Sequence, residues 1–209
     1  SEISGLGNEA ITLDDTTLAA TVLNTLDGNT TGAVNAATVT TLTGAAAAVI
    51  TTYDSSGISG LGNEKLTLSG STSVANANTL AADTTGVITA TITETDASTL
   101  ATLTETTNAY TITVGDTSVT AANLNTIDGA TTVAVTATAV TTITGAAADV
   151  NTAYASSGIN GLGNEAVTLS DTTLAVATLN TLNGNTTGVV NAATVATLTG
   201  AASAMNTAY

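Results

Sequence analysis

Internal repetition is the feature that most restricts what this chain can fold into. The pentapeptide Gly-Leu-Gly-Asn-Glu occurs at residues 5–9, 60–64 and 161–165. Segments 1–53 and 157–209 align without a gap and are identical at about three quarters of their positions. Such self-similarity predicts a stack of similar units, each covered by its neighbours, and disfavours a single irregular domain.

The repeats predict one tandem-repeat domain over residues 1–209, built from modules of about 45 residues. The modules are 9–53, 64–108, 110–154 and 165–209. Segments 1–8, 54–63 and 155–164 are expected to be spacers. Because the pattern recurs after 156 residues and 1–8 resembles the end of the spacer 155–164, we expect a window from a longer periodic array.

Each module divides into two coils of roughly 22 residues. Alternation such as that of residues 167–169 indicates a short strand. The stretch that follows has helical signals, with Asp116 or Asp171 as an N-cap and Gly129 or Gly184 at the end. One strand and one short helix per coil are therefore expected.

Two architectures fit this coil length. The first is an α/β solenoid that resembles leucine-rich repeats, with a parallel sheet on one side and short helices on the other. The second is an all-β right-handed parallel β-helix, which the threonines and valines favour because they are mediocre helix formers. The aspartate caps, the glycine stops and the alanine-rich segment 145–154 favour the α/β solenoid, which is our prediction.

The charge balance excludes several partners. The formal net charge is −15, and Lys65 is the single basic residue. Nucleic-acid binding requires many Lys and Arg side chains, and an anionic membrane surface would repel this chain. No apolar run reaches the ~20 residues of a membrane span.

Catalysis is not expected. The chain has no His, Cys or Arg, so carboxylates are the remaining candidates for acid–base chemistry. The densest group is Glu94, Asp96 and Glu105. Paired carboxylates can hydrolyse glycosides, but sugar sites also use aromatic platforms, which are scarce here. We interpret the group as a solvated turn face.

Asp15, Asp116 and Asp171 occupy the same position in three modules, and they are the candidate metal ligands. Calcium binds carboxylate and carbonyl oxygens, but three acidic groups converging on one point are not evident. Helix capping explains this register better, so no cofactor is expected.

Threonine, asparagine and tyrosine residues also recur in register. The threonine pairs could form an ice-binding face, although turn chemistry explains them better; they are Thr30-Thr31, Thr84-Thr85, Thr106-Thr107, Thr131-Thr132 and Thr186-Thr187. The asparagines that are expected to join successive coils are Asn24, Asn125 and Asn180. The tyrosines that are expected to cover the stack before each spacer are Tyr53, Tyr154 and Tyr209.

Segments 161–174, 124–132 and 140–150 resemble the repeats of very large secreted or cell-surface proteins of bacteria, notably marine cyanobacteria. The resemblance implies an extracellular, adhesin-like or stalk-like setting without a defined activity. Such proteins often also carry calcium-binding nonapeptide repeats, but the Gly-Gly-x-Gly-x-Asp motif is absent here, so calcium dependence is not implied.

These observations predict a structural spacer or stalk segment of an extracellular repeat protein. Its expected partner is itself, by end-to-end stacking of uncapped coils. The alternative is a repetitive binding face for calcium, ice or a glycan on an extracellular surface.

Overall fold

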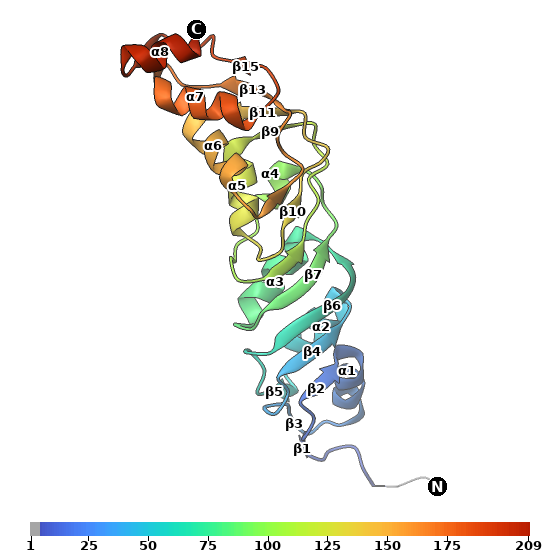
Figure 1. Ribbon diagram of the computed structural model, residues 1–209. Coiled ribbons are helices and arrows are strands. Elements are labelled where there is room, and N and C mark those ends of the chain that lie inside the picture. Colours follow the sequence, from blue (N-terminus) through green and yellow to red (C-terminus); the bar gives the residue numbers. More distant parts are fainter. Residues whose placement is uncertain (1–4) are drawn as a thin grey trace. The chain divides into compact units, whose positions relative to one another are not determined.

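The structure is a computed structural model that describes residues 5–209; residues 1–4 of the expected spacer 1–8 lie outside the described residues. Short helices alternate with short strands along the described chain (Figure 1). The helices are α1 (Ala20–Asn29), α2 (Ala46–Asp54), α3 (Val74–Asp83), α4 (Ala97–Leu100), α5 (Ala121–Gly129), α6 (Ala147–Ala155), α7 (Val176–Asn185) and α8 (Ala202–Ala208).

The chain divides into two compact units. The first contains the described residues up to Thr93 together with Thr104–Thr111. Its strands are β1 (Ile11–Thr12), β2 (Thr17–Ala19), β3 (Val34–Asn35), β4 (Thr41–Gly44), β5 (Ile58–Ser59), β6 (Lys65–Thr72), β7 (Ile88–Ile92) and β8 (Ala109–Thr111). They form parallel sheets of order β1-β3-β5 and β2-β4-β6-β7-β8.

The second unit contains Glu94–Leu103 and Ile112–Tyr209. Its strands are β9 (Ser118–Thr120), β10 (Val135–Thr136), β11 (Thr142–Gly145), β12 (Ile159–Asn160), β13 (Ala166–Leu169), β14 (Thr173–Ala175), β15 (Val190–Asn191) and β16 (Thr197–Thr199). They form parallel sheets of order β15-β13-β11-β9, β10-β12 and β14-β16. Helices α5 to α8 follow one another along one side of the four-stranded sheet (Figure 1).

Neighbouring strands are related by a nearly constant step along the sequence. Thr17 pairs with Thr41, and Thr41 pairs in turn with Lys65 after an equal interval. The step is shorter between β7 and β8, where Thr89 pairs with Ala109. Parallel neighbours need a crossover of a dozen or more residues, and this step leaves room for one short helix. The coil length expected from the repeats agrees with these steps.

The core of each unit is a column of aliphatic side chains on successive strands. In the first unit Leu42 pairs with Leu66, which pairs with Ile88, and all three are fully buried. In the second unit Ile143 and Val167 form the same column. Each inward side chain alternates with an outward threonine, because successive side chains of a strand point to opposite faces.

The all-β alternative is wrong and the expected α/β class is confirmed, but the expected single strand per coil is wrong for most coils: β1 and β2 both precede α1, and β3 and β4 both precede α2. In α5 the buried residues are Ala121, Leu124 and Ile127, a spacing that places them on one face of a helix. Strand alternation would have placed Leu124 and Ile127 on opposite faces. The periodicity and the burial it permits therefore outweigh the modest helix propensity of threonine and valine.

The segments that were expected to be spacers contribute strands. Segment 54–63 contains β5, which pairs with β3, and segment 155–164 contains β12, which pairs with β10. These pairings continue the step that relates β2 to β4. In the part of the chain that the structure describes, no helix has the length and hydropathy needed to cross a membrane.

Candidate functional site

The glutamate of the second pentapeptide copy is completely buried. Glu64, immediately before β6, has 0 % exposure. Its Oε1 and Oε2 accept hydrogen bonds from the N–H of Gly62 at 2.8 and 2.9 Å, and Oε1 accepts one from Asn63 at 3.3 Å. The hydroxyl of Tyr53, in α2, donates to Oε2 at 2.7 Å. The carboxylate thus ties the end of α2 to the start of β6.

The third copy repeats most of this geometry, but the buried Oε1 of Glu165 has no hydrogen-bond partner among the described residues. Glu165 also has 0 % exposure, and its Oε2 accepts hydrogen bonds from the N–H groups of Gly163 and Asn164 at 2.8 and 3.1 Å. The hydroxyl of Tyr154, in α6, donates to the same oxygen at 2.9 Å. We call each arrangement of glutamate, preceding glycine and asparagine, and tyrosine a glutamate joint.

A buried carboxylate is stable only when donors replace its lost water. Consecutive backbone N–H groups form an anion-binding concavity, and here they belong to the same pentapeptide as the glutamate. Each tyrosine adds one neutral donor to the carboxylate. Burial raises the pKa of Tyr154 to about 12, and the charge of Glu165 adds to this effect. Burial beside Glu64 also raises the pKa of Tyr53.

The threonine pairs 84–85 and 186–187 bond the main chain of the same joints. Thr84 donates from Oγ1 to the carbonyl oxygen of Glu64 at 2.8 Å, and the same Oγ1 accepts from the N–H of Gly86 at 3.0 Å. Thr186 bonds the carbonyl oxygen of Glu165 at 2.7 Å in the same way. Both threonines are buried. The interpretation as turn chemistry is confirmed for them, and their hydroxyls are not part of an exposed threonine rank.

The aspartates cap helices, but not the helices expected from the sequence. Asp171 accepts a hydrogen bond from the N–H of Ala147, the first residue of α6, at 2.8 Å. Asp116 accepts one from Ala97, the first residue of α4, at 2.6 Å. The prediction that each caps the helix after it is wrong, because β14 and β9 intervene. Asp15, in the same register, is exposed.

The asparagines join successive helices, as expected. Asn24 donates from Nδ2 to the carbonyl oxygen of Ala48 in the next helix, at 2.9 Å. Asn180 does the same with Ala204 at 2.9 Å, and Asn125 with the carbonyl oxygen of residue 149 at 3.0 Å. Each bond spans 24 residues. These side chains repeat the step that also relates the strands.

The acidic group expected from the sequence is divided between the two units, and Asp96 is bonded within its own helix. Asp96 is the N-cap of α4, and its Oδ1 accepts from the N–H of Thr99 at 2.9 Å and from Ser98 Oγ at 2.6 Å. Both bonds lower the pKa of Asp96, and the bond from Ser98 has the larger effect. Glu94 belongs to the second unit and Glu105 to the first.

Metal ligation has little geometric support in the described chain. Asp96 and Asp116 line one pocket of about 200 Å³, but both carboxylates accept helix N–H groups. Among residues 5–209, no group of three or more His, Cys, Asp or Glu side chains is placed to hold a metal ion.

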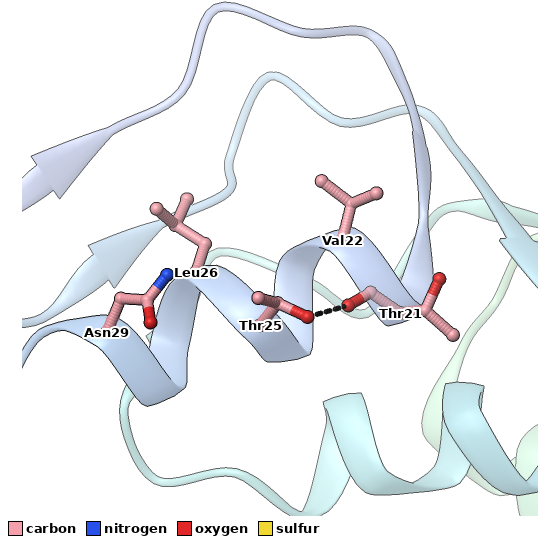
Figure 2. Close-up of a pocket in the computed structure, with 5 residues that line it drawn as sticks. All are labelled: Thr21, Val22, Thr25, Leu26 and Asn29. Atoms are coloured by element: carbon pink, nitrogen blue, oxygen red, sulfur yellow. Dashed lines mark hydrogen bonds between the residues drawn. The ribbon is translucent and has the colours of Figure 1, made fainter.

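Two further hollows lie on the terminal modules and are lined in large part by apolar side chains. One of about 380 Å³ is lined by five residues of α1 (Figure 2). Val22 and Leu26 point to the same side of this helix, and Thr25 donates to the carbonyl oxygen of Thr21 at 2.7 Å (Figure 2). Another hollow, of about 300 Å³, includes Leu198, Ala208 and Tyr209. Neither contains a titratable group other than Tyr209.

The first pentapeptide copy and the last tyrosine form no such joint within the described chain. Glu9 accepts from the N–H of Gly7 at 2.6 Å and of Asn8 at 3.1 Å, and the bond from Gly7 is the main reason why its pKa is lowered. Its side chain is half-buried, whereas Tyr209 is 97 % exposed. The expectation that Tyr209 covers the stack is therefore wrong.

The sequence interpretation missed the glutamates as the centre of the joints. The signal was present: a tyrosine precedes the pentapeptide glutamate by eleven residues at Tyr53 and Glu64 and again at Tyr154 and Glu165. A buried glutamate without a cationic partner is uncommon, so the spacing alone did not suggest one.

Comparison of the chain with models of protein families, with curated proteins and with solved structures gives no match. The interpretation of its function therefore rests on its own geometry and sequence.

Proposed function

We propose that this chain is a structural spacer segment, an α/β solenoid in which each coil contributes strand and helix to a leucine-rich-repeat-like stack. Its role comes from length: it holds other parts of a large protein apart. It performs no catalysis.

The main support for this proposal is that the polar side chains form hydrogen bonds between neighbouring coils. Four carboxylates, those of Glu64, Glu165, Asp116 and Asp171, each bond a neighbouring coil or turn. The asparagine amides do the same across 24 residues. Such side chains stabilise nearest neighbours in a repeat array, and they are not directed at a common ligand.

The composition and the repeats support an extracellular or cell-surface setting. The repeats resemble those of giant bacterial surface proteins, which are adhesin-like. A net charge of −15 keeps a long repetitive rod soluble and repels other anionic surfaces.

Tandem proteins of one, two and four copies test the proposal. An Ala-Ser link after Tyr209 places the next Glu9 eleven residues later, the spacing of Tyr154 and Glu165. Eight coils at the ~4.8 Å spacing of parallel strands add roughly 40 Å per copy. Electron microscopy and small-angle scattering should show rods that lengthen by equal increments. Compact particles, or independent globules like those of a control with a long flexible link, would refute it.

A further inference from the structure

The two ends of the chain have the sequences that meet at its internal joint. Segment 1–53 matches 157–209, and segment 165–209 matches 110–154. In the second unit, residues 112–154 of this module pack directly against the coils that follow, through α6 with α7 and β11 with β13. The last module therefore has the surface that an inner module packs against the following coil. The first module has the surface that such a following coil packs against the module before it.

The N-terminal face is the outer side of α1. Leu26 is half-exposed there, whereas its counterpart Leu182 in α7 is fully buried. Val22 is 55 % exposed, and with Leu26 it lines the hollow of Figure 2. In α7 the corresponding position, Thr178, accepts a hydrogen bond from Asn151 of α6 through its carbonyl oxygen.

The C-terminal face is formed by α8 and the end of the chain. Ala208 is exposed, whereas its counterparts Ala153 and Thr52 are each 1 % exposed. Tyr209 is 97 % exposed, and its counterpart Tyr154 bonds Glu165. This face thus has the side chains that an inner coil uses for its contacts, and they are exposed in the described residues.

We propose that the C-terminal face of one copy binds the N-terminal face of a second copy and forms a glutamate joint between them. Tyr209 donates to Glu9 of the second copy, as Tyr154 donates to Glu165. Asp15 of the second copy caps Ala202, the first residue of α8, as Asp171 caps Ala147. The inference rests on the proposed function, whose coil-to-coil contacts it continues across two chains.

One feature of Glu9 and one of Asp15 agree with this partner. Glu9 is already held by the N–H groups of Gly7 and Asn8, so the acceptor of the joint is pre-formed. Asp15 is exposed, although Asp116 and Asp171 in the same register cap helices. The contact joins two different faces, and such heterologous contacts form open-ended chains of copies when the rotation does not close.

The net charge of −15 per copy opposes association. Salt screens charges that are separated by more than about 10 Å at ~0.1 M, whereas the apolar contact of Val22 and Leu26 persists. Association is therefore expected to strengthen as salt is added.

Sedimentation velocity of the chain from micromolar to millimolar concentration tests the proposal. Val22→Asp blocks the N-terminal face and Ala208→Asp blocks the C-terminal face; both sites are exposed, so the fold is retained. Each variant alone should associate at least about 100-fold more weakly, because it places an unpaired carboxylate in the contact. An equimolar mixture should form a one-to-one dimer through the two unblocked faces. Val133→Asp, at another exposed valine of the second unit, is the matched control and should associate like the original chain.

A chain that stays monomeric to millimolar concentration would overturn the inference, as would a mixture of the two blocked variants that contains no dimer. Association of either blocked variant at the original strength would do the same. Failure of this inference can be distinguished from failure of the proposed function. If linked copies form rods while free copies stay monomeric, the spacer function is supported and the binding of a second copy is refuted.

Discussion

The hydroxyl of Tyr154 donates a 2.9 Å hydrogen bond to Oε2 of Glu165, eleven residues later in the chain. Glu165 has no exposure to solvent, so this bond replaces part of the hydration that its carboxylate loses. Tyr53 and Glu64 repeat the relationship in the first unit. The same local geometry at two places indicates that it belongs to the repeat and to the way in which one coil is joined to the next.

Tyr154→Phe removes this hydroxyl and keeps the ring. Hydrogen bonds to charged groups contribute about 1.5–3 kcal/mol, so the free energy of unfolding should fall by about 2 kcal/mol. Urea denaturation at low protein concentration measures it. Tyr209→Phe is the matched control: its side chain is 97 % exposed, and the change should be within ~0.5 kcal/mol. Equal effects of the two substitutions would contradict the joint.

Alkaline pH should destabilise the chain through its buried phenols. Burial raises the pKa of Tyr154 and of Tyr110 from 10.0 to about 12. Between these values the unfolded chain loses phenolic protons that the folded chain retains, so unfolding is favoured as pH rises. The contribution of these groups is fully present below pH 10 and is lost by about pH 12. Urea denaturation at several pH values in this range measures the loss of stability, and phenolate absorbance follows the ionisation of the tyrosines. A free energy of unfolding that stays constant over the range would contradict the prediction.

Asp171→Ala removes the cap of α6, although Asp171 lies 24 residues after the helix start. Loss of an N-cap costs about 1 kcal/mol, so the melting temperature and the free energy of unfolding should both fall. Asp15→Ala changes the same residue type in the same register, where the side chain is exposed. That control should leave the stability of the dilute chain unchanged. A larger loss from Asp15→Ala would show that the capping assignment is wrong.

Two glycines four residues apart should respond in opposite directions to alanine. A Cβ at Gly188 would collide with the backbone carbonyl of Glu165, and forced overpacking costs about 1–3 kcal/mol. Gly184 lies inside α7, and a Cβ there meets nothing within 4 Å. Gly184→Ala should stabilise the chain by about 0.5–1 kcal/mol. Thermal melts of both variants check this; stabilisation by Gly188→Ala would refute the close contact at the joint.

The sequence was sufficient to predict the α/β class, the approximate coil length and the inter-coil role of the asparagines. These follow from periodicity, because an apolar position such as Leu66 or Ile143 must recur wherever one coil covers the next. The asparagines share a register for the same reason: Asn24 and Asn180 each meet the next helix after one full step.

The site details depended on contacts between coils that spacing alone does not identify. Asp171 stands before a helical pattern and therefore has the local signature of an N-cap. It instead caps α6 in the preceding coil, because β14 separates it from α7. The burial of Glu165 could not be predicted from the sequence. Its donors include backbone N–H groups, and their directions depend on the loop conformation, which residue spacing does not specify. At Gly163, for example, φ is +141°, which favours glycine.

Distances between equivalent threonines test the central claim, the linear stacking of coils, most directly. Thr25, Thr79, Thr126 and Thr181 are exposed, and each bonds the carbonyl oxygen four residues earlier in its own helix. The chain contains no Cys, so cysteine at two of these positions accepts spin labels selectively.

Pulsed electron paramagnetic resonance on the dilute chain then measures the separation of Thr25 from each of the other three positions. The proposed linear stack of coils predicts that this separation grows steadily from Thr79 to Thr126 to Thr181. A Thr25–Thr181 distance equal to or shorter than the Thr25–Thr126 distance would show that the chain folds back on itself, and it would contradict the proposed linear stacking of coils.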